Sequence, residues 1–378
     1  MPTHLIHCFP LPTDNGGISY TAVSLYREMR QQGFPVSFLT PVIRKEAFGL
    51  GIRQTTPLPF RILPWRCQRR LCFRNYTKAV LRAARPGVVL DFWSDHPSPL
   101  LAEAKRRGAT ILKEKFNCAQ AVARDILSAE YARLGLANRC KITEASIQRE
   151  WDQLTIADLI NSPSPLVTDS LIHIQVAPKK IIDTSFGWEP RPTTREQPSL
   201  VAMCKRPRFL FVGSVEVRKG AHLLLEYWKA ARIDGTLVFM GAVREEMRSI
   251  IERLQPGPTV VFLGHREKAH QIYDEVDVFT FPSLEEGSPL VTYEAMGRGL
   301  PVLLSPMGAG GIARTNFDGF VVPPHDRSEW IQALTRLAAD PPLRRQFGAT
   351  AAARATKFLW EKTAAQRYAS LATKLGEV

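Results

Sequence analysis

The sequence lacks several features that would decide its class at once. No apolar run approaches the ~18 residues that a membrane-spanning helix needs. The first residues show no basic segment followed by an apolar stretch, so we expect no secretory signal peptide. No Cys-x-x-Cys pair occurs among the cysteines, and we therefore expect free thiols in a reducing cytoplasm, with neither a disulfide framework nor a zinc site. The cysteines are Cys8, Cys67, Cys72, Cys118, Cys140 and Cys204.

A nicotinamide-dependent oxidoreductase is also excluded. Such a protein would need Gly-x-Gly-x-x-Gly after a strand, with an acidic residue ~20 residues further on. The glycines between Gly308 and Gly311 do not have that spacing.

The composition is that of an ordinary globular protein. Apolar residues make up 45% of the 378 residues and charged residues 23%. A chain of this length exceeds what one hydrophobic core usually organises, so we expect two domains. We place them at residues 1–190 and 191–357, followed by a last helix at 358–378.

Strands and helices alternate twice along the chain, which predicts an α/β protein with two parallel sheets. In the first half we expect strands at 4–9, 35–40, 88–92 and 110–112 and a long helical region at 119–154. In the second half we expect strands at 208–213, 235–241, 259–264, 278–281, 301–304 and 320–322. Residues 186–207 are rich in Pro, Arg and Thr and form the expected hinge.

The most informative segment is FPSLEEGSPLVTYEAMGRGLPVLL, from Phe281 to Leu304. It reads as strand, loop, helix and strand, with Glu286 before the helix and Glu294 inside it. The free N–H groups at such a helix start favour an anion, whereas carboxylates suit sugar hydroxyls. Both chemistries within ten residues suggest a sugar nucleotide as the ligand.

This block resembles the retaining glycosyltransferases of the GT-B fold, family 4. Glu286 and Glu294 stand in a Pro-Ser-x-x-Glu-Gly and Glu-Ala-Met-x-x-Gly-x-Pro-Val context. The resemblance implies two Rossmann-like domains that face a central cleft, with the C-terminal helix crossing back to the first domain. It also implies transfer of a sugar from a UDP- or GDP-linked donor to a hydroxyl of a glycan, a lipid-linked acceptor or a small molecule.

The same resemblance assigns roles to individual residues. Glu286 would hold the transferred sugar and Glu294 the ribose, while the cations after the strand at 208–213 would neutralise the diphosphate. Catalysis would involve Glu286, Lys219 and His96. The donor-binding residues would be Gly16, Gly17, Ser214, Arg218, Lys219, Glu286, Gly287, Ser288, Pro289, Leu290 and Glu294.

Three positions depart from the family pattern. Ser214 stands where the family commonly has Arg, and Ser288-Pro289 stands where it often has Phe-Gly. No His follows the strand at 110–112, so His96, Lys115 and Asn117 are the expected acceptor-binding residues.

The expected mechanism is retaining and independent of metal. The departing phosphate would be stabilised by cations and helix N–H groups, and it could itself accept the acceptor's proton. No Asp-x-Asp of the metal-dependent class follows a predicted strand. The alternative is a GT-B-like nucleotide-sugar-binding protein with weak or lost catalysis; a GT-B phosphorylase would usually be much longer.

A basic stretch covers residues 61–85, in a chain with a formal net charge of +14. It interleaves Arg66, Arg69, Arg70, Arg74 and Lys78 with apolar residues that include Trp65, Phe73 and Tyr76. A solvated helix face, an anionic membrane surface and an anionic acceptor all fit this pattern. Nucleic acid fits less well and is not an expected partner. We therefore expect a cytoplasmic protein with a possible peripheral contact at the inner membrane face.

Overall fold

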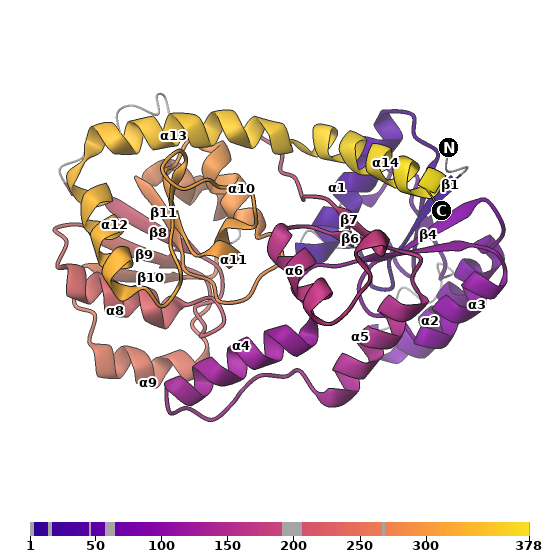
Figure 1. The fold of residues 1–378 in the computed structure, drawn as a ribbon, viewed down its shortest axis with the longest axis horizontal. Helices are drawn as coiled ribbons and strands as arrows, with labels where there is room; N and C mark the ends of the chain where they lie inside the picture. The colour runs from indigo at the N-terminus through magenta and orange to yellow at the C-terminus, as the bar shows by residue number, and fades with distance from the viewer. Residues whose placement is uncertain are drawn as a thin grey trace.

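The computed structural model describes residues 4–13, 17–44, 47–56, 65–190, 206–266 and 269–377, with the side chains of 65–69, 269–270 and 377 left out. Two parallel sheets form the centres of two α/β domains that lie side by side (Figure 1). Most strand residues are buried, as expected for parallel strands covered by helices on both faces. The predicted fold class is confirmed.

The first sheet has seven strands in the order β3-β2-β1-β4-β5-β6-β7. Its strands are β1 (His4–Cys8), β2 (Val36–Thr40), β3 (Arg53–Gln54), β4 (Val88–Phe92), β5 (Thr110–Glu114), β6 (Leu159–Ser162) and β7 (Ile181–Asp183). The accompanying helices are α1 (Gly17–Gln31), α2 (Trp65–Ala83), α3 (Ser98–Arg106), α4 (Gln120–Arg133), α5 (Glu144–Ile156), α6 (Pro165–His173) and the 3₁₀ turn η3 (Pro178–Lys180).

The second sheet has six strands in the order β10-β9-β8-β11-β12-β13. They are β8 (Arg208–Val212), β9 (Thr236–Met240), β10 (Val260–Gly264), β11 (Val278–Phe281), β12 (Val302–Leu304) and β13 (Gly319–Val321). The remaining helices are α8 (Ala221–Ala231), α9 (Glu245–Leu254), η4 (Ala269–Glu275), α10 (Leu290–Gly297), α11 (Pro306–Ala309), α12 (Arg327–Ala339), α13 (Pro341–Ala355), η5 (Thr356–Phe358) and α14 (Trp360–Glu377).

Two differences from the expected elements stand out. The helical region at 119–154 is two helices, because the chain leaves the helix at Leu134 and Gly135 and re-enters it at the Thr143 N-cap. Gly135 has a φ of +65°, which a helix interior does not accommodate. Most of the expected hinge, at 191–205, lies outside the described residues.

The last helix crosses from the second domain onto the first, as the GT-B resemblance implies. Helix α13 lies on the second domain, and α14 continues along the top of the molecule to pack against α1 (Figure 1). The Tyr368 ring stacks on Phe34 with centroids 4.2 Å apart. The Trp360 N–H donates to the Trp188 carbonyl at 3.1 Å, which ties the start of α14 to the chain between the domains.

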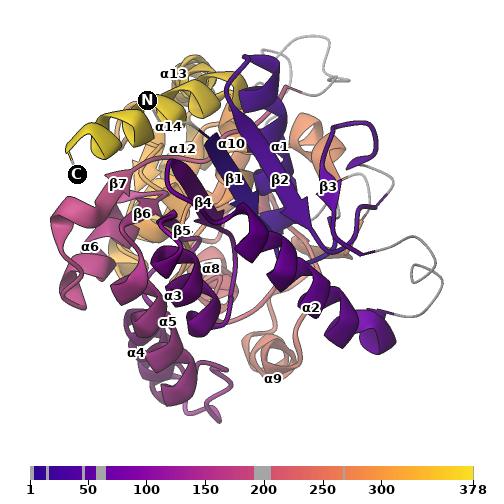
Figure 2. The ribbon, with the colours of Figure 1, turned by 90° about the vertical axis from the view of Figure 1, so that its right-hand side faces the viewer.

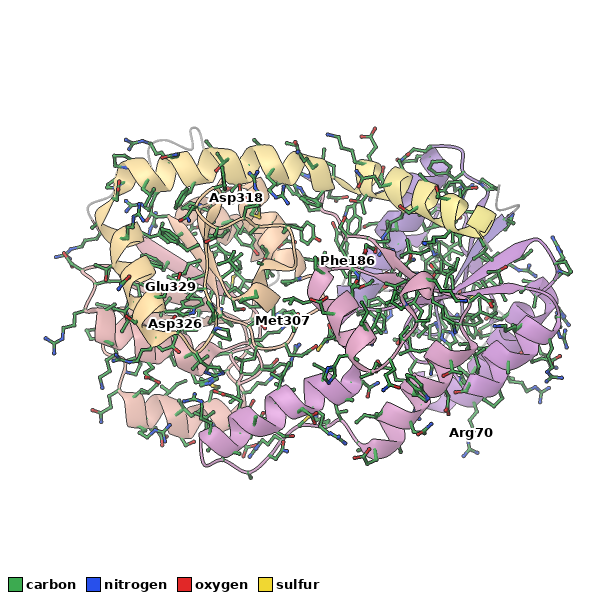
Figure 3. The ribbon with its side chains drawn as sticks, viewed as in Figure 1. Arg70, Phe186, Met307, Asp318, Asp326 and Glu329 are labelled. Carbon is green, nitrogen blue, oxygen red and sulfur yellow. The ribbon has the colours of Figure 1, made fainter. Side chains whose placement is uncertain are left out.

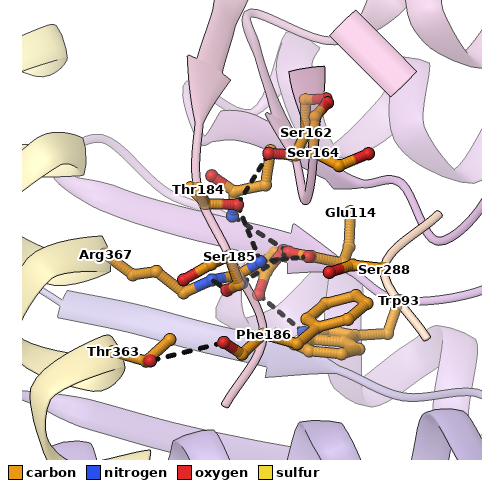
Figure 4. Close-up of polar contacts among 12 residues, drawn as sticks. Trp93, Glu114, Ser162, Ser164, Thr184, Ser185, Phe186, Ser288, Thr363 and Arg367 are labelled. Atoms are coloured by element: carbon orange, nitrogen blue, oxygen red, sulfur yellow. Dashed lines mark hydrogen bonds and ion pairs between the residues drawn. The ribbon is translucent and has the colours of Figure 1, made fainter. Parts of the chain in front are cut away.

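A buried ion pair anchors α14 to the first sheet (Figure 4). The Arg367 guanidinium donates to both carboxylate oxygens of Glu114, at 2.7 and 3.1 Å. It also donates to Thr184 and to the Ser185 carbonyl, and the Asn161 amide donates to Glu114. Because every member has partners, the desolvation of the two charges is offset within one network.

Directly after Glu114, the loop at 115–118 touches the second domain. Asn117 forms an isolated antiparallel bridge with Gly287. A Cβ on Gly287 would lie 1.4 Å from the Phe116 carbonyl oxygen, so only glycine permits this approach of the two backbones. The Cys118 thiol donates to Glu285 Oε1 at 3.5 Å, and burial raises the pKa of Cys118, which keeps this donor protonated.

A second contact between the domains is made by α4, which reaches beneath the second domain (Figure 1). Glu130 Oε1 lies 2.5 Å from His222 Nε2, and Arg133 also donates to this carboxylate. Burial raises the pKa of Glu130, but the hydrogen bonds from His222 and Arg133 outweigh this effect and lower the pKa to about 2. Figure 2 shows the same molecule from the side of the first domain, with α4 and α9 below the two sheets.

We predict that Arg367→Met destabilises the protein by ~3–5 kcal/mol, because the variant leaves the Glu114 carboxylate buried without its cation. The Arg367→Met and Glu114→Leu double variant should recover a large part of this loss. Exposed Lys362→Met, on the same helix, is the control and should stay within about 0.5 kcal/mol of the parent. Denaturant unfolding measures all three; equal stability of parent and Arg367→Met would contradict the anchoring role.

We predict that Gly287→Ala separates the loop at 115–118 from the second domain, because the added methyl group collides with the Phe116 carbonyl. The amides of this loop should then exchange with deuterium faster, whereas those of β5 keep their protection. Gly376→Ala, where a Cβ meets nothing within 4 Å, is the control. Unchanged exchange at Asn117 in the Gly287 variant would show that the bridge does not hold the domains together.

Candidate functional site

Two loops of the second domain build the site at the carboxyl ends of β8 and β11. Gly220, at the start of α8, has a φ of +68°, and a Cβ there would lie 2.0 Å from the Pro282 carbonyl oxygen. The Leu284 N–H donates to the Arg218 carbonyl at 2.9 Å. The glycine and this hydrogen bond bring the cations of one loop against the acids of the other.

Lys219 and Glu286 form an ion pair inside this junction. Both side chains are largely buried, and the Ser283 hydroxyl donates to the same Glu286 oxygen at 3.2 Å. Burial, followed by the neighbouring Arg218 cation, lowers the pKa of Lys219 to about 7, although Glu285 and Glu216 oppose this. At neutral pH this amine therefore gains or loses a proton readily.

Arg218 lies beside this pair and has carboxylate partners of its own. Its guanidinium donates to Glu285 Oε2 at 3.2 Å and to Glu216 Oε1 at 3.1 Å. The Asn117 amide reaches the same Glu285 oxygen at 3.4 Å from the first domain. Glu285 therefore connects the cationic loop with the first domain, a role that the sequence did not indicate.

A third cation, Arg244, was missed by the sequence analysis. It lies at the carboxyl end of β9, where it donates to the Ser214 hydroxyl at 3.3 Å and approaches Glu216 at 3.8 Å. This guanidinium stands beside the position where the family pattern has Arg and this chain has Ser214. Its place shortly after a buried strand was the one sequence signal that could have revealed it.

Helix α10 carries the second expected carboxylate. Pro289 precedes its first turn, and the Ser288 hydroxyl lies 2.5 Å from the Tyr293 hydroxyl. Glu294 is half-buried and accepts a hydrogen bond from the Tyr273 hydroxyl at 3.0 Å. It lines a small pocket between α10, η4, α1 and the chain around Trp188.

The predicted residues of the first domain are only partly brought to this site. Gly17 begins α1 with a φ of +47°, whereas Gly16 lies outside the described residues. Asn117 contacts the site through a hydrogen bond to the Glu285 side chain and a backbone bridge to Gly287. Lys115 is largely buried and forms an ion pair with Glu150 of α5, a partner that the sequence did not indicate.

His96 does not face the cleft, contrary to expectation. Its side chain is 1% exposed, and Nε2 lies 2.9 Å from the Tyr76 hydroxyl beneath α2. Burial, and next the Lys113 cation, hold the pKa of His96 well below its usual range, so the ring is neutral. This geometry gives His96 a packing role between α2 and β4 and does not support contact with a substrate or a part in catalysis.

The junction can bind a compact polyanion next to a polyhydroxylated group. Three cations and the start of α10 offer donors for the anion, and the carboxylates Glu286 and Glu294 offer acceptors for hydroxyls. Among the described residues, no group of three or more His, Cys, Asp or Glu side chains is arranged to hold a metal ion. No helix in the described part is long and apolar enough to span a membrane.

Comparisons with known proteins show which sequences and structures the chain is similar to. Residues 206–340 match the family model described as glycosyl transferases group 1. The D-inositol 3-phosphate glycosyltransferase of Arthrobacter sp. (strain FB24) is 31% identical over 209 residues, 51% of this chain and 48% of that protein. The UDP-Gal:alpha-D-GlcNAc-diphosphoundecaprenol alpha-1,3-galactosyltransferase of Escherichia coli is 38% identical over 85 residues, 22% of each chain. The matched segments thus span about half or less of these relatives.

Solved structures share the whole architecture. Sucrose-phosphate synthase from Thermosynechococcus elongatus superposes with a TM-score of 0.70 at 20% identity, covering 99% of this chain and 100% of that one. HepE of Anabaena, in complex with UDP and glucose, gives 0.70 at 16% identity and covers 98% and 100%. WaaG, a glycosyltransferase of lipopolysaccharide biosynthesis, gives 0.64 at 16% identity and covers 96% and 98%. Residues 206–340 are therefore similar to the group 1 glycosyl transferases, and the whole chain has the two-domain fold of these solved structures.

Proposed function

We propose that this protein transfers a sugar from a nucleotide-diphosphate sugar to an acceptor hydroxyl, with retention of the anomeric configuration and without a metal ion. The observation that carries the proposal is the buried Lys219 and Glu286 pair, held where the β8 and β11 loops meet. A cation and a carboxylate at one point suit the two halves of such a donor, its diphosphate and its sugar.

Binding of the donor exchanges the partners within the site. The diphosphate takes Lys219 and Arg218 from their carboxylates, and the freed Glu286 accepts hydrogen bonds from the sugar hydroxyls. Glu294, which accepts a hydrogen bond from Tyr273, binds the ribose hydroxyls. Ser214, together with Arg244, supplies further donors to the phosphates. UDP is the first donor to test, because HepE was solved with UDP and with UDP-glucose.

The chemistry needs little beyond this preorganised charge. Cleavage of the anomeric C–O bond leaves negative charge on the departing phosphate, where the cations and the α10 N–H groups stabilise it. The acceptor oxygen attacks the oxocarbenium-like sugar from the face that the phosphate leaves, and its proton passes to a phosphate oxygen. No separate base is then required.

The residues expected on the acceptor side do not select one class of acceptor. Lys115, next to Glu150, and Asn117 lie on the side of the first domain that faces the donor loop. By their names, one relative acts on inositol phosphate and another on a diphosphoundecaprenol-linked sugar. A sugar-containing, lipid-linked or small polyol acceptor fits this range.

The alternative is a nucleotide-sugar-binding protein with weak or lost catalysis. Ser214 and the missing His after β5 favour it, whereas Arg244 beside Ser214 restores a cation where the family has one. Incubation with pooled sugar nucleotides discriminates the two, because an enzyme of this class slowly hydrolyses its donor and a binding protein leaves it intact.

We predict that Lys219→Ala and Glu294→Ala each weaken donor affinity or turnover at least ~10-fold, since each removes a charged hydrogen bond of ~1.5–3 kcal/mol. Lys229→Ala, an exposed cation on α8 away from the loops, should leave both quantities unchanged. Calorimetric UDP binding and donor turnover measure the effect. Parent-like values in both site variants, with the fold intact, would remove the donor assignment.

We predict that the product keeps the anomeric configuration of the donor and that activity survives EDTA. Proton NMR of fresh product reports the coupling constant of the anomeric proton before any mutarotation. An inverted linkage, or activity that returns only when a divalent ion is added back, would contradict the proposed mechanism.

The basic face of the first domain supports a peripheral membrane contact. Arg70 points away from the body of the protein (Figure 3), and Arg74, Lys78 and Arg82 of α2 are also exposed. One part of the sequence-based idea is wrong, because Tyr76 is fully buried against His96 and cannot anchor in a membrane. The side chains of Trp65, Arg66 and Arg69 lie outside the described ones.

We predict that the protein co-sediments with anionic vesicles at low salt and less so at 0.5 M salt, since each cation near such a surface contributes ~1 kcal/mol. Changing Arg66, Arg69, Arg70 and Arg74 to Gln should abolish binding. A control with the same charge change on the second domain should still bind, with Arg248, Arg253, Arg327 and Arg345 changed to Gln. Equal loss in both variants would show a nonspecific charge effect.

A further inference from the structure

A cavity of about 260 Å³ lies between α2 and the first sheet, away from the proposed donor site. Its lining includes Arg53 of β3, Arg82 at the end of α2 and Arg85 just after it, together with His4 and Ser37. We call these five residues the arginine pocket. Figure 2 shows α2 on the β2 side of the sheet, facing the viewer.

The charge of the arginine pocket is one-sided. None of its described lining residues is acidic. Arg53, Arg82 and Arg85 are exposed at the rim of the cavity, and within the described part of the chain no ion pair involves any of them. Three arginines that line one cavity without an acidic neighbour favour a bound anion.

The polar groups beside the arginines complete a suitable donor set. His4 Nε2 lies 2.7 Å from the Ser37 hydroxyl at the cavity wall. Burial, and next the Arg85 cation, lower the pKa of His4, which agrees with a positive potential inside the cavity. Planar guanidiniums present paired N–H donors that match the oxygens of a phosphate. The cavity volume exceeds that of several water molecules, so it also accommodates a group attached to the phosphate.

The position separates this cavity from the donor site. His4 and Ser37 lie at the beginning of β1 and β2, and Arg85 precedes β4. Lys219 and Glu286 lie in the second domain, in the loops that follow the carboxyl ends of β8 and β11. Occupants of the two sites therefore do not compete for the same residues.

We propose that the arginine pocket binds a phosphate group, either of a soluble phosphate compound or of a phospholipid headgroup. The proposal is independent of glycosyl transfer. It differs from a general basic surface because it requires the cations that line the cavity, Arg53, Arg82 and Arg85, and not Arg70, Arg74 and Lys78, which do not line it.

The test compares two variants with the same charge change. One has Arg53, Arg82 and Arg85 changed to Gln; the other has Arg70, Arg74 and Lys78 changed to Gln. Calorimetry with inorganic phosphate should show a saturable site in the parent, at least about tenfold weaker in the first variant and parent-like in the second. The donor site is itself expected to bind phosphate groups through Lys219, so Lys219→Ala should keep the site that the first variant loses.

Vesicles of phosphatidylglycerol and of phosphatidylcholine distinguish the two sources of the phosphate. A loss of phosphatidylglycerol binding that is greater in the Arg53, Arg82 and Arg85 variant than in the Arg70, Arg74 and Lys78 variant, without binding of inorganic phosphate at this site, assigns the pocket to a headgroup. Saturable binding of inorganic phosphate assigns it to a soluble ligand. Equal losses in the two variants, loss of the same site in Lys219→Ala, or no binding in either assay would overturn the proposal.

Discussion

The buried ion pair between Arg367 and Glu114 joins the last helix to the strand whose following loop reaches the second domain. It fixes α14, the last segment of the second domain, to the carboxyl end of β5. The residues that follow Glu114 form the loop at 115–118, which bridges to Gly287 of the donor loop. The same strand thus carries both the ion pair with α14 and the loop that meets the second domain's site. Such a fully satisfied polar network gives a defined arrangement even where its net contribution to stability is small.

Ion pairs within the protein hold the site together. Lys219 pairs with Glu286 and Arg218 with Glu285, so the cations expected to grip a diphosphate are neutralised before any ligand arrives. Both loops are fixed by Gly220 and by the hydrogen bond from Leu284. Under the proposed function, a diphosphate would displace these carboxylates and leave Glu286 to the sugar. Donor binding would then also prepare this carboxylate.

Short, local patterns in the sequence predicted much of this arrangement. The block from Phe281 to Leu304 places a buried strand, a loop, a helix start and a second strand in order, and the structure has β11, α10 and β12 there. Parallel strands are continuous apolar runs, so the six strands of the second sheet were visible without an alignment. The cations after β8 were found because a strand-to-helix turn is short and its residues stay adjacent.

What the sequence could not show depends on contacts between distant residues. Arg367 and Glu114 are 253 positions apart, and nothing local marks either as a buried ion. His96 follows a strand, as a cleft residue would. However, α2 covers its side chain, and the Tyr76 hydroxyl forms a hydrogen bond with Nε2. The sequence shows residue type and spacing but not which helix folds over a loop. Burial is the quantity that decided these cases.

Proton uptake on UDP binding tests the exchange of partners at Lys219 most directly. The unliganded amine has a pKa of about 7, and a diphosphate in contact with it favours the charged form. Calorimetry in two buffers of different ionisation enthalpy measures the number of protons taken up. The account predicts uptake that approaches one proton at pH 8 and falls toward zero at pH 6, with the pH-dependent part absent in Lys219→Arg. Tight UDP binding without uptake at any pH would contradict a site in which this lysine contacts the diphosphate.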